Sequence, residues 1–204
     1  MQSKPLNNTV LLVYTEQTPN PESLKFVTNQ MLYKGVADFK DREMARRWSP
    51  LAERLYGEDY VQSVYISNNF VTITKTQQFD WSEIMLPAKE LVKSLVEAGT
   101  KIVDEGYAEF AQSQLQPAGG GQYSERDSEI VQRIRDMIDT YVRPAVEMDG
   151  GNIEFKHYED GIVTVMMQGS CSGCPSSTVT LKAGIEGLLK RMVPEVQEVV
   201  AEAE

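Results

Sequence analysis

The sequence holds only two cysteines, Cys171 and Cys174, and two residues separate them. A short apolar, β-branched run at residues 162–167 precedes them and predicts a buried strand. After them, apolar residues recur at helical spacing over residues 181–192, which predicts a helix, and Pro175 suits its first turn. We therefore expect the cysteine pair on a loop between a strand and the N-terminus of a helix.

A helix N-terminus next to these cysteines should change their chemistry. Its unpaired N–H groups and the positive end of its dipole favour a thiolate over a thiol, so we expect both thiols to have a pKa below about 8.5. Gly169 and Gly173 allow the backbone to turn tightly and to approach a bulky ligand, and Ser170 and Ser172 complete the loop. Thiolates in this setting are good metal ligands or nucleophiles.

Four roles are open to such a pair. The first is two reduced cysteines without a chemical role, against which the exposed character of a Gly-, Ser- and Pro-rich loop argues. The second is a redox-active dithiol of the thioredoxin kind, but that fold needs more strands after its helix than residues 194–204 can supply. The other two are a zinc ion and an iron–sulfur cluster, which both prefer four ligands.

One chain offers fewer than four such ligands. Besides the two thiolates there is a single histidine, His157, which lies in an alternating run and is expected to be an ordinary strand residue. Two chains that pair across a two-fold axis would supply four thiolates together. A site of this kind lies at a subunit boundary and is removable, which suits a carrier better than a permanent structural clip.

Several motifs of the chain resemble those of the NifU-like (Nfu) iron–sulfur proteins. Residues 148–153 (Met-Asp-Gly-Gly-Asn-Ile), 169–177 (Gly-Ser-Cys-Ser-Gly-Cys-Pro-Ser-Ser) and 193–196 (Val-Pro-Glu-Val) are similar to the C-terminal domain of that family. Residues 18–26 (Thr-Pro-Asn-Pro-Glu-Ser-Leu-Lys-Phe) resemble the opening of its N-terminal domain. Both resemblances occur in the family's order.

The resemblance implies a [4Fe–4S] cluster that two identical subunits share and deliver to apo iron–sulfur proteins. It assigns ligation to Cys171 and Cys174, allows a [2Fe–2S] form, and implies an upstream cluster assembly scaffold as the donor. Composition alone does not separate an iron–sulfur site from a zinc site. A zinc-bridged homodimeric interaction protein and a dithiol redox protein therefore stay as alternatives.

Charge and hydropathy argue against several classes of partner. The chain has a formal net charge of −10, divided into −3 for residues 1–126 and −7 for residues 127–204. An acidic domain repels phosphates, so nucleic acid and anionic membranes are not expected as partners. No apolar run approaches the ~18 residues of a membrane span, and the first residues resemble neither a secretory signal nor an Arg-rich transit peptide. Cysteines at this spacing fit a reducing compartment, so we expect a cytoplasmic location.

The pattern predicts two small α+β domains joined by a flexible linker. The linker is the Gln-, Pro- and Gly-rich stretch 112–126, which is too polar to fold. Residues 1–111 should form an Nfu-type N-terminal domain with strands at 10–14, 23–27 and 34–39, a hairpin at 61–75, and helices after Ser49 and Asp80. Residues 127–204 should form the NifU-like domain, in which Asp127 or Ser128 caps a helix and the helices pack on one face of a small mixed sheet.

The N-terminal half has no metal-ligand or catalytic spacing, so we expect a module for acceptor docking or regulation. Its most basic stretch supplies the candidate docking residues, which are Lys40, Arg42, Arg46 and Arg47. Asn20 is expected to be a turn residue. The chain has no Ser/His/Asp set, no paired carboxylate arrangement and no phosphate-binding Gly motif, so we do not expect an enzyme.

Overall fold

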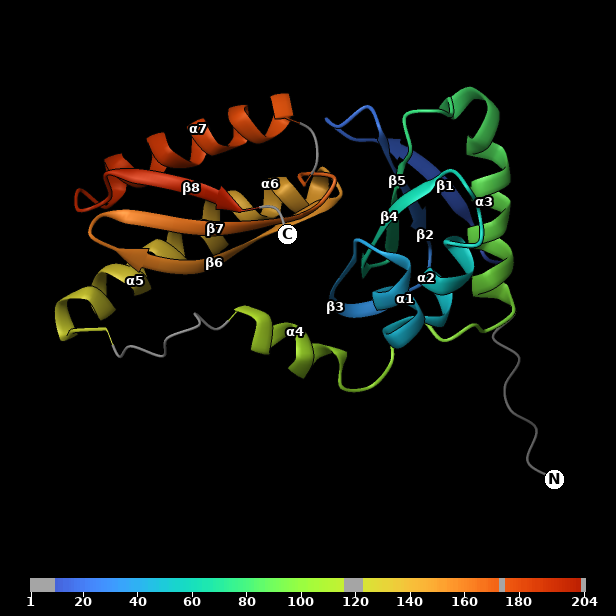
Figure 1. Ribbon diagram of the computed structural model, residues 1–204, viewed down its shortest axis with the longest axis horizontal. Coiled ribbons are helices and arrows are strands. Elements are labelled where there is room, and N and C mark those ends of the chain that lie inside the picture. Colours follow the sequence, from blue (N-terminus) through green and yellow to red (C-terminus); the bar gives the residue numbers. More distant parts are fainter. Residues whose placement is uncertain (1–9, 116–122, 173–174, 203–204) are drawn as a thin grey trace.

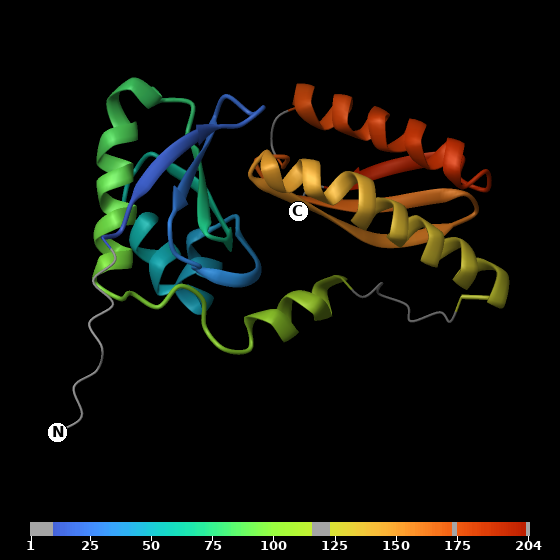
Figure 2. The same ribbon diagram turned by 180° about the vertical axis from the view of Figure 1, so that it is seen from behind.

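The computed structural model describes residues 10–115, 123–172 and 175–202. The elements form two α+β units, each with one sheet and its own helices, and Figures 1 and 2 show them side by side. Each unit has a large hydrophobic core of its own. The predicted fold class is therefore confirmed. No helix in the described part of the chain is long and apolar enough to span a membrane.

The N-terminal sheet has five strands in the order β1-β2-β5-β4-β3, and all neighbouring strands are antiparallel. Their bounds are β1 Val13–Gln17, β2 Ser23–Thr28, β3 Tyr33–Phe39, β4 Val61–Asn68 and β5 Phe70–Lys75. The predicted hairpin is the β4–β5 pair, and Asn68 has the positive φ of 47° that its turn requires.

The first three helices of this unit lie on one face of the sheet, and the fourth extends from the β3 edge towards the C-terminal unit (Figure 1). They are α1 Arg42–Trp48, α2 Pro50–Leu55, α3 Trp81–Glu97 and α4 Tyr107–Leu115. Asp41, Ser49 and Asp80 cap the first three by accepting backbone N–H hydrogen bonds, as predicted for Ser49 and Asp80. Alternate strand residues such as Phe26, Ile66, Val71 and Ile73 are buried beneath the helices. The opposite face of the sheet points towards the C-terminal unit (Figures 1 and 2).

The C-terminal unit has the predicted order of a helix, two strands, a helix and a final strand. Its elements are α5 Glu125–Met137, the π-helical turn η1 Ile138–Val142, α6 Arg143–Met148, β6 Gly151–Glu159, β7 Ile162–Gly169, α7 Pro175–Met192 and β8 Glu198–Glu202. Strand β7 pairs antiparallel with β6 and parallel with β8, which makes the expected small mixed sheet. Alternating residues of these strands share one core with residues of α5 and α7.

Three local expectations differ from the structure. Strand β1 begins at Val13 rather than at residue 10. Ser124 caps α5 by accepting from the backbone N–H of Asp127, so Asp127 lies in the first turn, where the helix dipole favours a carboxylate. Helix α4 continues to Leu115 and α5 begins at Glu125, so both ends of the predicted linker are helical, while residues 116–122 lie outside the described residues.

Ser49 joins two parts of the N-terminal unit, and its removal should measurably destabilise the unit. Its buried hydroxyl accepts from the backbone N–H of Ala52 at 2.9 Å and donates to the carbonyl oxygen of Ile102. Because Ser49→Ala removes both hydrogen bonds, we expect it to lower the free energy of unfolding by about 1–3 kcal/mol. Urea unfolding followed by tryptophan fluorescence reports on this unit, since it contains both tryptophans, Trp48 and Trp81. The exposed Glu97→Ala should stay within about 0.5 kcal/mol, and an equal loss in both variants would contradict the prediction.

Candidate functional site

The cysteine loop leaves the end of strand β7 next to the turn that precedes β6. Gly151 pairs with Gly169 in the β6–β7 ladder, so the two segments lie side by side. Gly169 has a φ of +64°, and its carbonyl oxygen accepts from both the backbone N–H and the hydroxyl of Ser172. These hydrogen bonds form the tight turn that holds Cys171, in agreement with the turning role expected of Gly169.

Glycine is required where the two segments meet. A Cβ atom on Gly151 would lie 2.6 Å from the carbonyl oxygen of Gln168 and 3.0 Å from the sulfur of Cys171. A Cβ atom on Gly169 would lie 2.7 Å from the carbonyl oxygen of Gly150. Contacts this short need a backbone shift, so only bare backbone lets the turn and the cysteine loop approach each other closely.

Cys171 is buried, with 7% of its surface exposed, and its thiol has a raised pKa. Burial raises the pKa of Cys171 to about 11, the hydrogen bond with Ser170 lowers it, and the nearby Asp149 carboxylate raises it. The expectation of a lowered pKa is therefore wrong for Cys171. Helix α7 begins only at Pro175, and burial of the thiol, which disfavours the thiolate, is the largest cause of the raised pKa.

Two of the expected site residues, Gly173 and Cys174, lie outside the described residues. The expected start of the helix at Pro175 is confirmed. His157 lies on β6, about 20 Å along the strand from Gly151, where its ring contacts the hydroxyl of Tyr123 at 3.1 Å. Within the described ranges, no group of three or more His, Cys, Asp or Glu residues could hold a metal ion.

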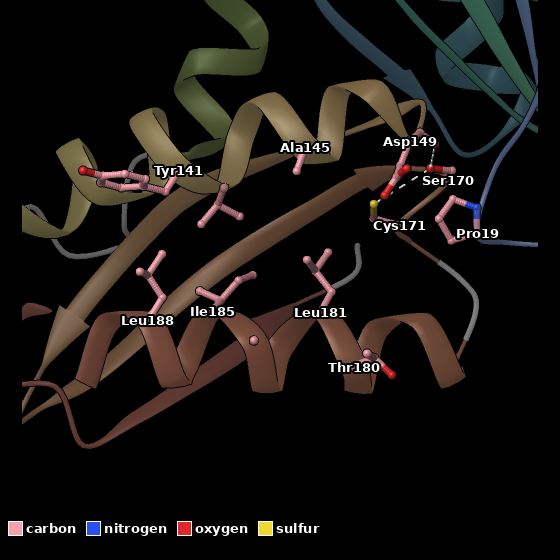
Figure 3. A pocket seen from close by; sticks show the side chains of 12 residues that line it. Pro19, Tyr141, Ala145, Asp149, Ser170, Cys171, Thr180, Leu181, Ile185 and Leu188 are labelled. Atoms are coloured by element: carbon pink, nitrogen blue, oxygen red, sulfur yellow. Dashed lines mark hydrogen bonds between the residues drawn. The ribbon is translucent and has the colours of Figure 1, made fainter. Parts of the chain in front are cut away.

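Cys171 lies at one end of a pocket of about 640 Å³ between α7 and the η1–α6 segment (Figure 3). The pocket is mostly apolar along its length, whereas Asp149 and Ser170 lie beside the thiol, and the hydroxyl of Ser170 donates to the carbonyl oxygen of Asp149. Its walls include Tyr141, Val142, Ala145, Leu181, Ile185 and Leu188. The helical spacing of its apolar residues predicted α7, but a periodic stripe does not distinguish a filled core from a pocket wall.

The N-terminal unit reaches this site, which sequence reasoning missed. Pro19 lines the pocket, and the side-chain amide of Asn20 donates to the carbonyl oxygen of Ser170 at 3.3 Å. Asn20 is also the turn residue that was expected, because its side-chain oxygen accepts from the backbone N–H of Glu22 at 3.0 Å. The Thr-Pro-Asn-Pro motif was the sequence signal that could have indicated this contact, but a turn was a sufficient explanation for the motif.

The candidate docking residues do not form one uniform patch. Arg42, Arg46 and Arg47 are exposed on α1, Arg42 at its first position and the other two in its last turn. The guanidinium of Arg47 lies 4.9 Å from the ring of Trp48. Lys40 differs, because its ammonium is buried and lies 3.8 Å from the carboxylate of Asp38. Only the three arginines are therefore accessible to a partner.

Comparison with known families matches both halves of the chain. Residues 13–99 match the family described as "Scaffold protein Nfu/NifU N terminal", and residues 134–200 match the "NifU-like domain". The two matches cover more than half of the chain, in the order that the motifs predicted.

Similar proteins match along nearly the whole chain. The human protein named "NFU1 iron-sulfur cluster scaffold homolog, mitochondrial" is 37% identical over 191 residues, which are 93% of this chain and 71% of that protein. "NifU-like protein 4, mitochondrial" from Arabidopsis thaliana is 40% identical over 195 residues, which are 94% of this chain and 66% of that protein. The solution structure of a NifU-like protein from Saccharomyces cerevisiae covers 52% of this chain and 95% of its own, with 23% identity and a TM-score of 0.44.

Burial of Cys171 predicts slow thiol chemistry at neutral pH. A Cys174→Ser variant leaves Cys171 as the reporting thiol. Because the pKa of Cys171 is raised to about 11, we expect its alkylation at pH 8 to be about two orders of magnitude slower than in the urea-unfolded chain. The rate in the folded protein should keep rising with pH up to that pKa. A rate that levels off near pH 8.5 would contradict the burial of the thiol.

Proposed function

We propose, from the premise that this chain belongs to the NifU-like (Nfu) family, that it is a scaffold and carrier that holds an iron–sulfur cluster between two subunits and delivers it to apo-proteins. The family matches indicate the class of protein, an iron–sulfur cluster scaffold. The observation that carries the proposal is the turn at Gly169, paired with Gly151, which holds Cys171 next to α7. The cluster is the cargo of this protein and not a resident cofactor.

The ligands in this proposal are Cys171 and Cys174 of each subunit. Thiolate is the ligand that iron–sulfur clusters prefer, and two chains supply the four thiolates of a [4Fe–4S] or a [2Fe–2S] cluster. A buried thiol at Cys171 has to lose its proton when it becomes a ligand, so binding of the cluster releases protons. Ser170, Ser172, Gly169 and Gly173 hold the loop around the cargo.

Release follows from the position of the ligands. In the proposed dimer the four thiolates belong to two different subunits, and the sequence holds no third cysteine to replace them. An acceptor that presents its own cysteines can therefore displace the ligands one pair at a time. An upstream assembly scaffold supplies the cluster, and the net charge of −10 disfavours nucleic acid and anionic membranes as partners.

The alternatives differ in chemistry that can be measured. A zinc-bridged homodimeric interaction protein would use the same four thiolates, but it would be colourless. A dithiol redox protein is disfavoured, because β8 is the only strand described after α7. The proposed role includes no catalytic step, so we do not propose an enzyme. A cytoplasmic location stays a prediction from the sequence, and the human and Arabidopsis relatives are named as mitochondrial.

Loading of the chain under anaerobic conditions tests the ligand assignment. We expect the wild type to bind about two irons per chain for a shared four-iron cluster, and to change from a monomer to a dimer in light scattering on loading. Cys171→Ser and Cys174→Ser should each lose the visible absorption, since each removes two of the four ligands from a dimer. Ser128→Ala, at an exposed position on α5, should keep it. Zinc in place of iron and sulfide, or a loaded monomer, would refute the shared cluster.

Transfer to an acceptor tests the carrier role and the docking residues together. The loaded protein is mixed with an apo [4Fe–4S] enzyme and an iron chelator, and the recovery of enzyme activity is followed. We expect the triple variant Arg42→Ala, Arg46→Ala, Arg47→Ala to slow transfer several-fold without changing cluster content, while Arg191→Ala in the C-terminal unit should not. If recovery is no faster than from iron and sulfide in solution, the protein is not a carrier.

A further inference from the structure

The N-terminal sheet carries a row of polar side chains on the face that has no helices. Lys25, Thr72, Tyr65 and Asp38 are successive cross-strand partners on β2, β5, β4 and β3. We call these four residues the polar row. All four are buried, with 1–8% of their surface exposed. Since polar groups are rarely buried without hydrogen-bond partners, this face needs a polar surface against it.

The surface that covers the polar row is the turn before β6. The hydroxyl of Thr72 donates to the carbonyl oxygen of Gly150 at 2.9 Å, and the hydroxyl of Tyr65 donates to that of Gly151 at 3.3 Å. The ammonium of Lys25 donates at 3.1 Å to the carbonyl oxygen of Met148, the last residue of α6. A cation at this position also interacts favourably with the C-terminal end of the helix dipole.

The cysteine loop itself supplies the rest of this contact. Asn20 donates to the carbonyl oxygen of Ser170, which directly precedes Cys171. The backbone N–H of Gly169 donates to the carboxylate of Asp38 at 3.4 Å. The N-terminal unit therefore contacts both segments that position Cys171, and Pro19 lines the pocket into which the thiol faces (Figure 3).

Glycines of the C-terminal unit make this contact close. A Cβ atom on Gly150 would lie 2.8 Å from the hydroxyl oxygen of Thr72, and one on Gly169 would lie 2.8 Å from the ring of Tyr65. Side chains of one unit thus meet bare backbone of the other. The Gly150–Gly151 pair and Gly169 therefore form the local turn and also the surface that the N-terminal unit contacts.

The polar character of the contact allows it to open. The opposite face of the same sheet carries buried residues such as Phe26 and Ile73, which could not be exposed to water at low cost. Lys25, in contrast, keeps a carboxylate partner within its own unit, since its ammonium lies 3.0 Å from Glu16. Hydrogen bonds of the polar row to backbone carbonyls can be exchanged for hydrogen bonds to water, so these bonds add little to the cost of separation.

A loaded loop needs space that this contact occupies. In the proposed dimer, a cluster and a second subunit must reach the sulfur of Cys171, which has 7% of its surface exposed here. Asn20 donates to Ser170, the residue before Cys171, and Pro19 lines the pocket next to the thiol. The closed arrangement therefore fits the empty chain, and loading requires the loop to be uncovered.

We propose that the N-terminal unit is a reversible cap on the cysteine loop, and that it lifts from the loop when the cluster and the second subunit bind. This regulation rests on the proposed carrier function, because the cargo is what displaces the cap. The closed cap shields an empty cysteine loop, and the open form exposes the polar row of Lys25, Thr72, Tyr65 and Asp38.

The closed state is tested first, without any cluster. In a Cys174→Ser background, Thr72→Val removes a hydrogen bond across the contact, whereas Thr74→Val is a matched control whose hydroxyl pairs with Ser23 inside the N-terminal unit. We expect Thr72→Val to speed alkylation of Cys171 about tenfold and Thr74→Val to leave it unchanged. Equal rates in the two variants would overturn the cap.

A second variant tests the same contact in case Thr72→Val does not fold. Asn20→Asp keeps the side-chain oxygen that accepts from Glu22, but it replaces the donor to Ser170 with a negative oxygen that repels the carbonyl. It should therefore preserve the turn, open the contact and also speed alkylation of Cys171. If both Asn20→Asp and a folded Thr72→Val react at the wild-type rate, the cap does not exist.

Opening on loading is tested with the full-length wild type. Acylation by an amine reagent measures the exposure of Lys25, which is buried in the closed form, and the exposed Lys34 serves as a reference. We expect anaerobic loading with iron and sulfide to raise the labelling of Lys25 several-fold relative to Lys34. Unchanged labelling with a bound cluster would reject displacement of the cap. If no cluster binds, the carrier function fails, and the alkylation rates alone decide whether the cap exists.

Discussion

The close approach of two backbone segments, the Gly150–Gly151 turn and the end of β7 at Gly169, is the constraint on which this structure depends. A single methyl group at Gly151 or Gly169 would collide with backbone across the gap. The β6–β7 ladder, the position of Cys171 and the contact with the N-terminal unit all use the same bare backbone. A mutation there would disturb three features together, because all three use the same backbone segments.

Burial of Cys171 protects the thiol but also makes it less reactive as a ligand. A thiol with a raised pKa resists oxidation and alkylation, since both reactions need the thiolate. The same burial delays its use as a ligand. A domain that covers the loop through exchangeable polar hydrogen bonds reconciles the two demands, because the thiol is protected while the loop is empty and reactive once it is uncovered.

Much of the fold followed from local patterns, whereas the contact between the units did not. The strand and helix around the cysteines, the Asn68 hairpin and the Ser49 cap depend on residues close in sequence, so periodicity and turn chemistry predicted them. The polar row had no such signal. Lys25 and Thr72 alternate with apolar neighbours as solvent-facing strand residues do, and a single sequence does not state which surface covers them. The pKa of Cys171 was misjudged for the same reason, because burial is set by the whole fold.

The order of the two units along the chain has a consequence during protein synthesis. The N-terminal core is complete by Ala111, so this unit can fold while the rest of the chain is still being translated. The parallel pairing of β7 with β8, in contrast, cannot form until residues 198–202 have left the ribosome. The surface that covers the cysteine loop is thus folded before the loop is complete, and the C-terminal unit can dock on it as soon as its own sheet forms.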